Sequence, residues 1–315
     1  MISSLPLLVL SNVIVDDVWE ADGRHRGLNL GGAAVWAAVG AKFWLPAVGI
    51  VAGVGEDIDQ VSGGWLRKHG LLPDGEIKRT ANTIRSTLRY LPDGDRTETP
   101  AFGPEHFQNL QLIPADIPPS LRPAAATYIF RDLWPEFWDS YSEYRSQLGK
   151  TLWELQGDVA GAKYWSAIKT QLSNVDIFSL NLAEAECLLG AERTPQDLTS
   201  ELIDAGAGIV VLRMGARGAM VASGNARLFV RPPNYKVGDV TGGGNAFCGG
   251  FLAGWTLNPG DLELAARTAA ASAALCIGQY GLPDPAVSNV AVKLADACQV
   301  EWDSPVPLSE EKLHG

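Results

Sequence analysis

From residue 124 onward, short apolar runs alternate with amphipathic runs, and few folds are compatible with this alternating pattern. The apolar runs "AATYIF", "TLWELQ", "VDIFSL" and "GIVVLRMG" are typical of buried strands. The runs between them, such as "FWDSYSEYRSQL" and "LTSELIDAG", have the spacing of helices. Near the N-terminus, "LLVLSNVIVDDVW" predicts a further buried strand with Asp16 and Asp17 at its carboxyl end. The alternation predicts an α/β fold in which helices cover both faces of a mostly parallel sheet.

Two polar stretches interrupt this pattern, and each contains an Asp-Gly turn signal. Residues 80–100 alternate apolar and polar side chains, which predicts an exposed antiparallel ribbon. Residues of about 17–30 predict a second small hairpin. We therefore expect a single domain over residues 1–300, with a small β lid built from these two segments, and a C-terminal tail over 301–315.

Composition excludes several classes of partner. Of 315 residues, 46% are apolar and 19% are charged, which is typical of a soluble globular protein. The net charge of −11 argues against a nucleic-acid or anionic-membrane surface, because phosphate binding needs clustered Lys and Arg. The apolar run 31–55 is broken by Lys42, Pro46 and several glycines, so no membrane span is expected. The N-terminus lacks the basic start of a signal peptide, and four scattered cysteines predict reduced thiols in a cytoplasmic protein.

The stretch "KVGDVTGGGNAFCGGF", residues 236–251, contains the strongest functional signal. A glycine turn that opens a helix directs backbone N–H groups at an anion, so Gly242, Gly243 and Gly244 are candidates for an anion hole. The alternative is a glycine turn that merely lets the helix pack closely. Ligands of parallel sheets bind at the carboxyl ends of the strands. Asp16, Asn181 and the 239–245 turn follow predicted strands, and we expect them to converge on one cleft.

The segment "DVTGGGNAFCGGF" resembles the C-terminal signature of the ribokinase-like (PfkB) carbohydrate kinases, which usually reads Asp-Thr-Thr-Gly-Ala-Gly-Asp-Ala-Phe before a glycine pair. "NVIVDDVW", "GGAAVWAAVGA", "NLAEAECLLG", "VVLRMGARGAM" and "CIGQYGLPDP" resemble further elements of that family, in family order over about residues 5–285. The resemblance implies a three-layer ribokinase-like fold and an Mg-ATP-dependent phosphotransferase. A fungal branch, the Mak32-like proteins, is more similar still, since it shares the triple-glycine–asparagine turn, a Trp-Glu pair like that of "LWELQGD" and the ending "GQYGLP".

Asn245 occupies the position of the family's catalytic aspartate. That aspartate accepts the proton of the substrate hydroxyl, whereas an amide has no basic lone pair near neutral pH. General base catalysis contributes roughly 10²–10⁴-fold, so its loss predicts slow turnover and not necessarily none. Asn245 can still contact a ligand or serve as the N-cap of the helix, and the two roles are compatible.

The resemblance also assigns residues near the nucleotide. Asn181 and Glu184 match an Asn-x-x-Glu pair that helps to hold water-bound Mg²⁺ near the phosphates, and the alternative is a solvated helix start. Asp239 matches an acid often near a monovalent-cation site, and the alternative is an Asp that caps a turn. Gly215 belongs to the strand and turn that support the nucleotide. Arg213 stands where the family often has Thr, where it could pair with a phosphate or with a nearby acid.

On the substrate side, Asp16 matches the acid that binds substrate hydroxyls, and Gly31 with Gly32 matches a glycine pair that lets a sugar approach the backbone. Trp36 replaces a hydroxyl-binding Asn of the family, which favours a flatter or more apolar substrate; the alternative is simple core packing.

Three functions remain open from the sequence. The first is an attenuated or unusual kinase for a small hydroxylated substrate, and Asn245→Asp should then raise turnover. The second is a silent pseudokinase that binds a ligand or partner, and the third is a cleft reused for non-kinase chemistry on an apolar or aromatic metabolite. A homodimer that covers the exposed edges of the β lid is also expected.

Overall fold

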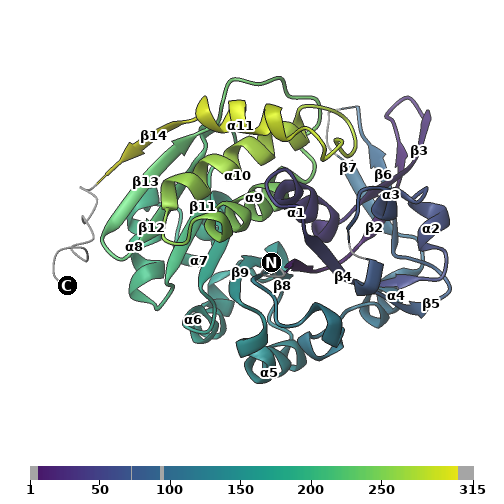
Figure 1. Ribbon diagram of the computed structural model, residues 1–315, viewed down its shortest axis with the longest axis horizontal. Helices are drawn as coiled ribbons and strands as arrows, with labels where there is room; N and C mark the ends of the chain where they lie inside the picture. Colours follow the sequence, from purple (N-terminus) through teal and green to yellow (C-terminus); the bar gives the residue numbers. More distant parts are fainter. Residues whose placement is uncertain (1–5, 72, 93–95, 304–315) are drawn as a thin grey trace.

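The computed structural model describes residues 6–71, 73–92 and 96–303, which form a large sheet between two layers of helices and a smaller sheet at one end (Figure 1). The large sheet has ten strands in the order β14-β13-β12-β11-β10-β9-β8-β1-β4-β5. Their bounds are β1 Leu7–Leu10, β4 Val48–Gly55, β5 Glu76–Thr80, β8 Ala126–Arg131, β9 Lys150–Leu155, β10 Ile177–Asn181, β11 Ile209–Arg213, β12 Ala219–Ser223, β13 Ala226–Arg231 and β14 Gln299–Trp302.

The strands from β5 to β11 in this order run parallel, and β12, β13 and β14 continue the sheet antiparallel. β1 and β4 are buried along their whole length because both sheet faces are covered, which explains their uninterrupted apolar sequences. The predicted fold class, a three-layer α/β fold with a mostly parallel sheet, is confirmed.

Two hydrophobic cores lie on the two faces of the sheet. One core joins it to α1 Ala33–Lys42, α9 Gly243–Leu257, α10 Leu262–Ile277 and α11 Ser288–Asp296. The other joins it to α5 Pro135–Tyr144, α6 Trp165–Leu172, α7 Leu182–Leu189 and α8 Pro195–Asp204. There are three shorter helices, α2 Ile58–Val61, α3 Trp65–Lys68 and α4 Gly103–Asn109, of which α2 and α3 add Ile58 and Leu66 to the first core.

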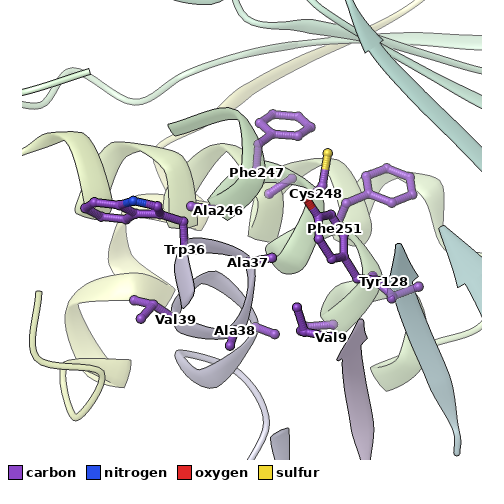
Figure 2. Close-up of a cluster of buried hydrophobic side chains, with 14 of the residues drawn as sticks. Val9, Trp36, Ala37, Ala38, Val39, Tyr128, Ala246, Phe247, Cys248 and Phe251 are labelled. Atoms are coloured by element: carbon purple, nitrogen blue, oxygen red, sulfur yellow. The ribbon is translucent and has the colours of Figure 1, made fainter. Parts of the chain in front are cut away.

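α1 and α9 approach each other closely enough for backbone to touch backbone. A Cβ on Gly40 of α1 would lie 2.2 Å from the carbonyl oxygen of Ala246, and a Cβ on Gly249 of α9 would lie 2.0 Å from that of Ala37. Figure 2 shows the two helices meeting through small residues, with Phe251 and Tyr128 filling the space toward the sheet. Glycine at these two positions therefore sets the spacing of the helices.

The smaller sheet has the order β3-β2-β6-β7, with bounds β2 Ile14–Trp19, β3 His25–Gly31, β6 Arg85–Tyr90 and β7 Arg96–Pro100. β2 pairs antiparallel with β3 and parallel with β6, which joins two distant segments of the chain into one sheet. We call this four-stranded sheet the lid.

The expectation of a single N-terminal strand ending at Asp16 and Asp17 is wrong. β1 ends at Leu10, the chain leaves the large sheet over Ser11–Val13, and both acids lie within β2 of the lid. One apolar run covers both strands because β2 keeps Val15 and Val18 buried. The acids therefore approach the site from the lid and not from the end of a central strand. At the other end of the chain, β14 continues to Trp302, two residues into the expected tail, and residues 304–315 lie outside the described residues.

Candidate active site

A pocket lies between the lid, helix α1, the loop that follows β13 and the loop that follows α10. It combines two carboxylates, from Asp16 and Asp239, with the aromatic rings of Trp36, Tyr90 and Tyr280. Its remaining walls are Val18, Asn29, Leu30, Leu88, Thr241 and Gly281. Carboxylates that can accept from hydroxyl groups beside flat apolar walls suit a small polar ligand with one flat face.

The glycine pair before α1 adjoins this pocket. A Cβ on Gly31 would lie 3.1 Å from Oδ2 of Asp16 and 3.5 Å from Nε1 of Trp36, so both side chains reach the same spot. Gly32 has a φ of 86° and is the N-cap of α1, where a Cβ would lie 2.5 Å from the carbonyl oxygen of Asn12. Asp16, Gly31, Gly32 and Trp36 are thus brought together.

The triple-glycine turn opens helix α9 at the deep side of the pocket. Gly242 is the N-cap with a φ of 74°, and no side-chain hydrogen bond caps the helix. The N–H of Gly243 donates to the carbonyl oxygen of Val240 at 3.3 Å. Because α9 is 15 residues long, its first turn carries a partial positive charge, and the remaining N–H groups of that turn suit an anion. Thr241, immediately before the turn, lines the pocket, so a ligand there lies next to this helix start.

Side chains pack directly on the turn. A Cβ on Gly242 would lie 2.0 Å from the indole of Trp36, and one on Gly244 would lie 2.1 Å from a terminal nitrogen of Arg213. Trp36 is 6% exposed, so it packs in the core as the alternative interpretation expected, and it also borders the pocket; its role toward a substrate stays a prediction. In Figure 2, Trp36 projects from α1 beside the start of α9.

Asn245 is not the helix N-cap, so that expectation is wrong; Gly242 takes the position and Asn245 lies in the first turn. Its Nδ2 donates to the hydroxyl of Tyr128 at 3.1 Å and to Oε2 of Glu154 at 3.2 Å. Tyr128 donates to the same Oε2 at 2.6 Å. Oε1 of Glu154 lies 2.9 Å from Nη1 of Arg213.

Sequence reasoning missed Glu154 and Tyr128 as site residues. Glu154 lies in β9 and is 3% exposed, and Tyr128 lies in β8 and is fully buried. The available signal was a carboxylate inside the apolar run "TLWELQ", because a buried strand excludes a charge that has no partner. Arg213, at the end of β11, pairs with acids and so takes one of the two roles predicted for it: besides Glu154, its Nη2 lies 3.8 Å from Oε2 of Glu184.

Burial and charge oppose each other in the pKa values of Arg213 and Glu184, but act together in those of Tyr128 and Cys248. Burial alone would lower the pKa of Arg213, but attraction to Glu154 and Glu184 outweighs it and the pKa is raised, so the guanidinium stays charged. Burial raises the pKa of Glu184, partly offset by the Asn181 N–H and by Arg213. Burial also raises the pKa of Tyr128 and of Cys248 well above their usual ranges, and the negative charge of Glu154 adds to both shifts, so both groups stay neutral.

Asn181 and Glu184 form a reciprocal capping box at the start of α7. Oδ1 of Asn181 accepts from the N–H of Glu184 at 2.9 Å, and Oε2 of Glu184 accepts from the N–H of Asn181 at 2.7 Å. Arg213 connects this capping box to the glycine turn, because its guanidinium group lies beside both Glu184 and Gly244. Gly215, with a φ of 59°, lies just beyond β11 in the turn that follows Arg213.

The residues present fit a hydrated Mg²⁺ ion that is held mainly by phosphate oxygens. Over residues 6–71, 73–92 and 96–303, no group of three His, Cys, Asp or Glu side chains could enclose a metal ion. Mg²⁺ usually keeps several waters and binds through one or two carboxylates together with substrate phosphates. Glu184 is the carboxylate that would contact such waters.

Asp239 forms the turn that leads to the glycines. Its Oδ1 accepts from the N–H of Thr241 at 3.0 Å and from the Thr241 hydroxyl at 2.8 Å. This geometry is that of an Asp that caps a turn, while the Asp239 side chain still lines the pocket.

Comparisons with known proteins place this chain in a family. The model of the pfkB family of carbohydrate kinases matches residues 22–288, and the protein belongs to this family. The cytidine kinase of Thermococcus kodakarensis is 28% identical over 272 residues, which cover 80% of this chain and 89% of that protein.

Solved structures show the same fold. An adenosine kinase from Sinorhizobium meliloti superposes with a TM-score of 0.73 at 21% identity, covering 94% of this chain and 100% of the other. A putative ribokinase II from E. coli in complex with ATP and Mg²⁺ superposes with a TM-score of 0.73 at 17% identity, covering 91% and 99%.

Within the described part of the chain, no helix is long and apolar enough to cross a membrane.

Proposed function

We propose that this protein is an Mg-ATP-dependent phosphotransferase that acts slowly on a small hydroxylated substrate of the sugar or nucleoside class. The observation that carries the proposal is the uncapped start of α9 at Gly242–Gly244, directly beside a pocket that contains Asp16. The helix start suits the transferring phosphoryl group, and the pocket suits the hydroxyl that attacks it.

The residues of the pocket and those around Arg213 each have a part in this reaction. Asp16 accepts hydrogen bonds from substrate hydroxyl groups, while Trp36 offers its indole face to a flat part of the substrate. Arg213 adds a permanent positive charge beside Gly244, and Asn181 with Glu184 lies where the magnesium–phosphate group would bind. Mg²⁺, when bound, neutralises phosphate charge.

The chemical step is an in-line displacement. The substrate O–H bond breaks as its oxygen bonds to the γ-phosphorus, the bond from that phosphorus to the bridging oxygen breaks, and ADP leaves with the electron pair. With an amide at 245, the proton passes to water and not to a carboxylate at that position. Because positioning and charge stabilisation supply most of the catalysis of phosphoryl transfer, activity persists at a reduced rate.

The aromatic walls favour a nucleoside over a simple sugar. Trp36, Tyr90 and Tyr280 offer three rings around one small pocket, more than a sugar needs. The similarity to cytidine kinase supports the same preference. Membership of the Mak32-like branch is a separate proposal that rests on the triple-glycine–asparagine turn and the Trp-Glu pair of "LWELQGD".

Calorimetric titration of the purified protein with ATP, with and without Mg²⁺, tests the proposal first. We expect micromolar, magnesium-dependent binding, and weakening of at least tenfold in Gly244→Ala, whose Cβ would overlap Arg213. Gly224→Ala is the matched control, since nothing lies within 4 Å of a Cβ there. No binding at millimolar ATP would contradict the kinase and favour a pseudokinase or a cleft with other chemistry. Where ATP binds, turnover of cytidine and ribose then separates an active kinase from a silent one.

A further inference from the structure

Glu154 has a partner on each of its carboxylate oxygens. Oε1 faces Nη1 of Arg213 at 2.9 Å, and Oε2 accepts from Tyr128 at 2.6 Å and from Asn245 at 3.2 Å. A carboxylate that is 3% exposed, paired with an arginine and bonded to two neutral donors, is stable in its charged form. One negative charge is thus fixed behind the glycine turn.

This charge determines which way the Asn245 amide points. The observed orientation directs Nδ2 at Oε2 of Glu154, while the reversed orientation would bring two acceptor oxygens together at about 3 Å. The amide is therefore held with its nitrogen toward the interior. Oδ1 takes no part in these bonds and is the atom left to accept a hydrogen bond from a ligand.

We propose that Glu154 is a positioning residue that fixes the Asn245 amide, so that Oδ1 accepts from the substrate hydroxyl, and that Glu154 makes an uncharged side chain necessary at position 245. The part that concerns the substrate hydroxyl rests on the function proposed above. The pairing of Glu154 with a neutral residue at 245 does not.

The pairing revises the expectation that Asn245→Asp alone restores a base. In that variant a carboxylate oxygen would replace Nδ2 and lie about 3 Å from Oε2 of Glu154. Two carboxylates this close do not both ionise near neutral pH, so one would hold a proton. Within the described part of the chain, Asn245 bonds to Tyr128 and Glu154, and Glu154 interacts in turn with Arg213 and Cys248. Arg213 already has two acids as partners, Glu154 and Glu184.

The test compares wild type with Asn245→Asp, Glu154→Gln and the double variant, by thermal unfolding between pH 4 and pH 8. In Asn245→Asp the pair has a folded-state pKa above its unfolded value, so the deficit in Tm relative to wild type grows as pH rises from about 4. We expect a deficit of at least about 4 °C at pH 8.

Glu154→Gln should lower the Tm when Asn is at 245 but raise it when Asp is at 245, because Gln can donate to the new carboxylate. Glu301→Gln, in the exposed ion pair with Arg231, is the matched control and should change the Tm little in either background. A Tm deficit of Asn245→Asp that does not depend on pH would overturn the pairing, even where Glu154→Gln fails to fold. Lowering of the Tm by Glu154→Gln in both backgrounds would do the same.

Positioning is tested by NMR without any substrate. The side-chain N–H₂ signals of Asn245, assigned by their loss in Asn245→Asp, should exchange slowly with water in wild type. In Tyr128→Phe and Glu154→Gln they should exchange at least tenfold faster. Unchanged exchange in both variants would show that the amide is not held by this pair. Failure to turn over cytidine or ribose would count against the kinase, while leaving these results standing.

Discussion

Trp36 and Gly242 meet at the point where the pocket reaches the glycine turn. The indole occupies the space that a Cβ on Gly242 would need, and the φ of 74° at Gly242 is one that other residues rarely adopt. Glycine is therefore required at position 242 for two reasons. The backbone conformation is strained for other residues, and Trp36 occupies the space that a side chain would need.

Gly242→Ala should destabilise the fold by roughly 3 kcal/mol, because both backbone strain and overlap with Trp36 add to the cost. Urea unfolding measures the change. Gly224→Ala separates the two causes, since Gly224 has a φ of 53° with nothing within 4 Å of a Cβ, and it should cost only about 1 kcal/mol. Equal losses in the two variants would show that Trp36 does not press on the turn.

At the residue scale, motif spacing predicted most of the site, but not the partners within it. The glycine turn, Asp16 and the Asn181–Glu184 pair could be identified from short stretches of sequence. Tyr128 and Glu154 reach Asn245 across 117 and 91 residues, and they resemble ordinary strand residues in the sequence. Only the register of β8 and β9 beside α9 shows that these side chains share one buried cluster.

Asp57 links the lid to the body of the molecule. Its Oδ1 accepts from the N–H and the hydroxyl of Thr83, at 2.6 and 2.8 Å, and its Oδ2 pairs with Arg85 at 2.6 Å. Arg85 is the first residue of β6 and Thr83 lies two residues before that strand, while Asp57 immediately precedes α2. Burial would raise the pKa of Asp57, but hydrogen bonds from Thr83 and Arg85 outweigh it and the pKa is lowered.

Asp57→Asn should free the lid more than it destabilises the large sheet. We expect a loss of about 2 kcal/mol at pH 7 and faster hydrogen exchange in β6 than in β4. Since the folded-state pKa of Asp57 lies below its unfolded value, its contribution is present above pH of about 4 and is lost as pH falls below that. The variant and wild type should therefore converge in stability at low pH, and an equal difference at pH 3 and pH 7 would contradict this role.

At the element scale, periodicity predicted β8 to β11 of the large sheet, missed β5 and the antiparallel strands β12, β13 and β14, and joined β1 and β2 into one strand. Strands such as "VDIFSL" stand alone between helices, so their ends are marked in the sequence. In "LLVLSNVIV" only the pair Ser11-Asn12 marks the passage from β1 to β2, a weak turn signal because both strands are apolar and the break at Ser11–Val13 is short. Whether part of this run joins the large sheet or the lid depends on whether it pairs with β4 or with β6, and both of these strands are distant in the sequence.

The lid leaves two outer strands, β3 and β7, at the edges of its sheet. Leu28 of β3 is 48% exposed, an unusual place for a large apolar side chain on an edge strand. These features support the proposed homodimer, in which the lid of one subunit covers that of the other.

Leu28→Lys should shift a dimer toward monomer by at least tenfold in dissociation constant, measured by sedimentation at micromolar protein. Leu257→Lys is the matched control, because Leu257 is 51% exposed at the end of α9, away from the lid. A wild-type protein that sediments as a monomer at these concentrations would end the proposal, as would equal effects of the two variants.

For the molecule as a whole, the close contact of α1 and α9 has a kinetic consequence. α1 carries Trp36 and begins at the Gly32 cap, while α9 begins at the glycine turn, so in the proposed kinase the two helices would hold the acceptor and donor ends of the transfer reaction. With backbone against backbone at Gly40 and Gly249, the distance between those ends cannot vary without separating the helices. If the protein is the proposed kinase, substrate entry and product escape would therefore depend on movement of the sheet that contains Asp16, and that movement would limit the rate of each turnover.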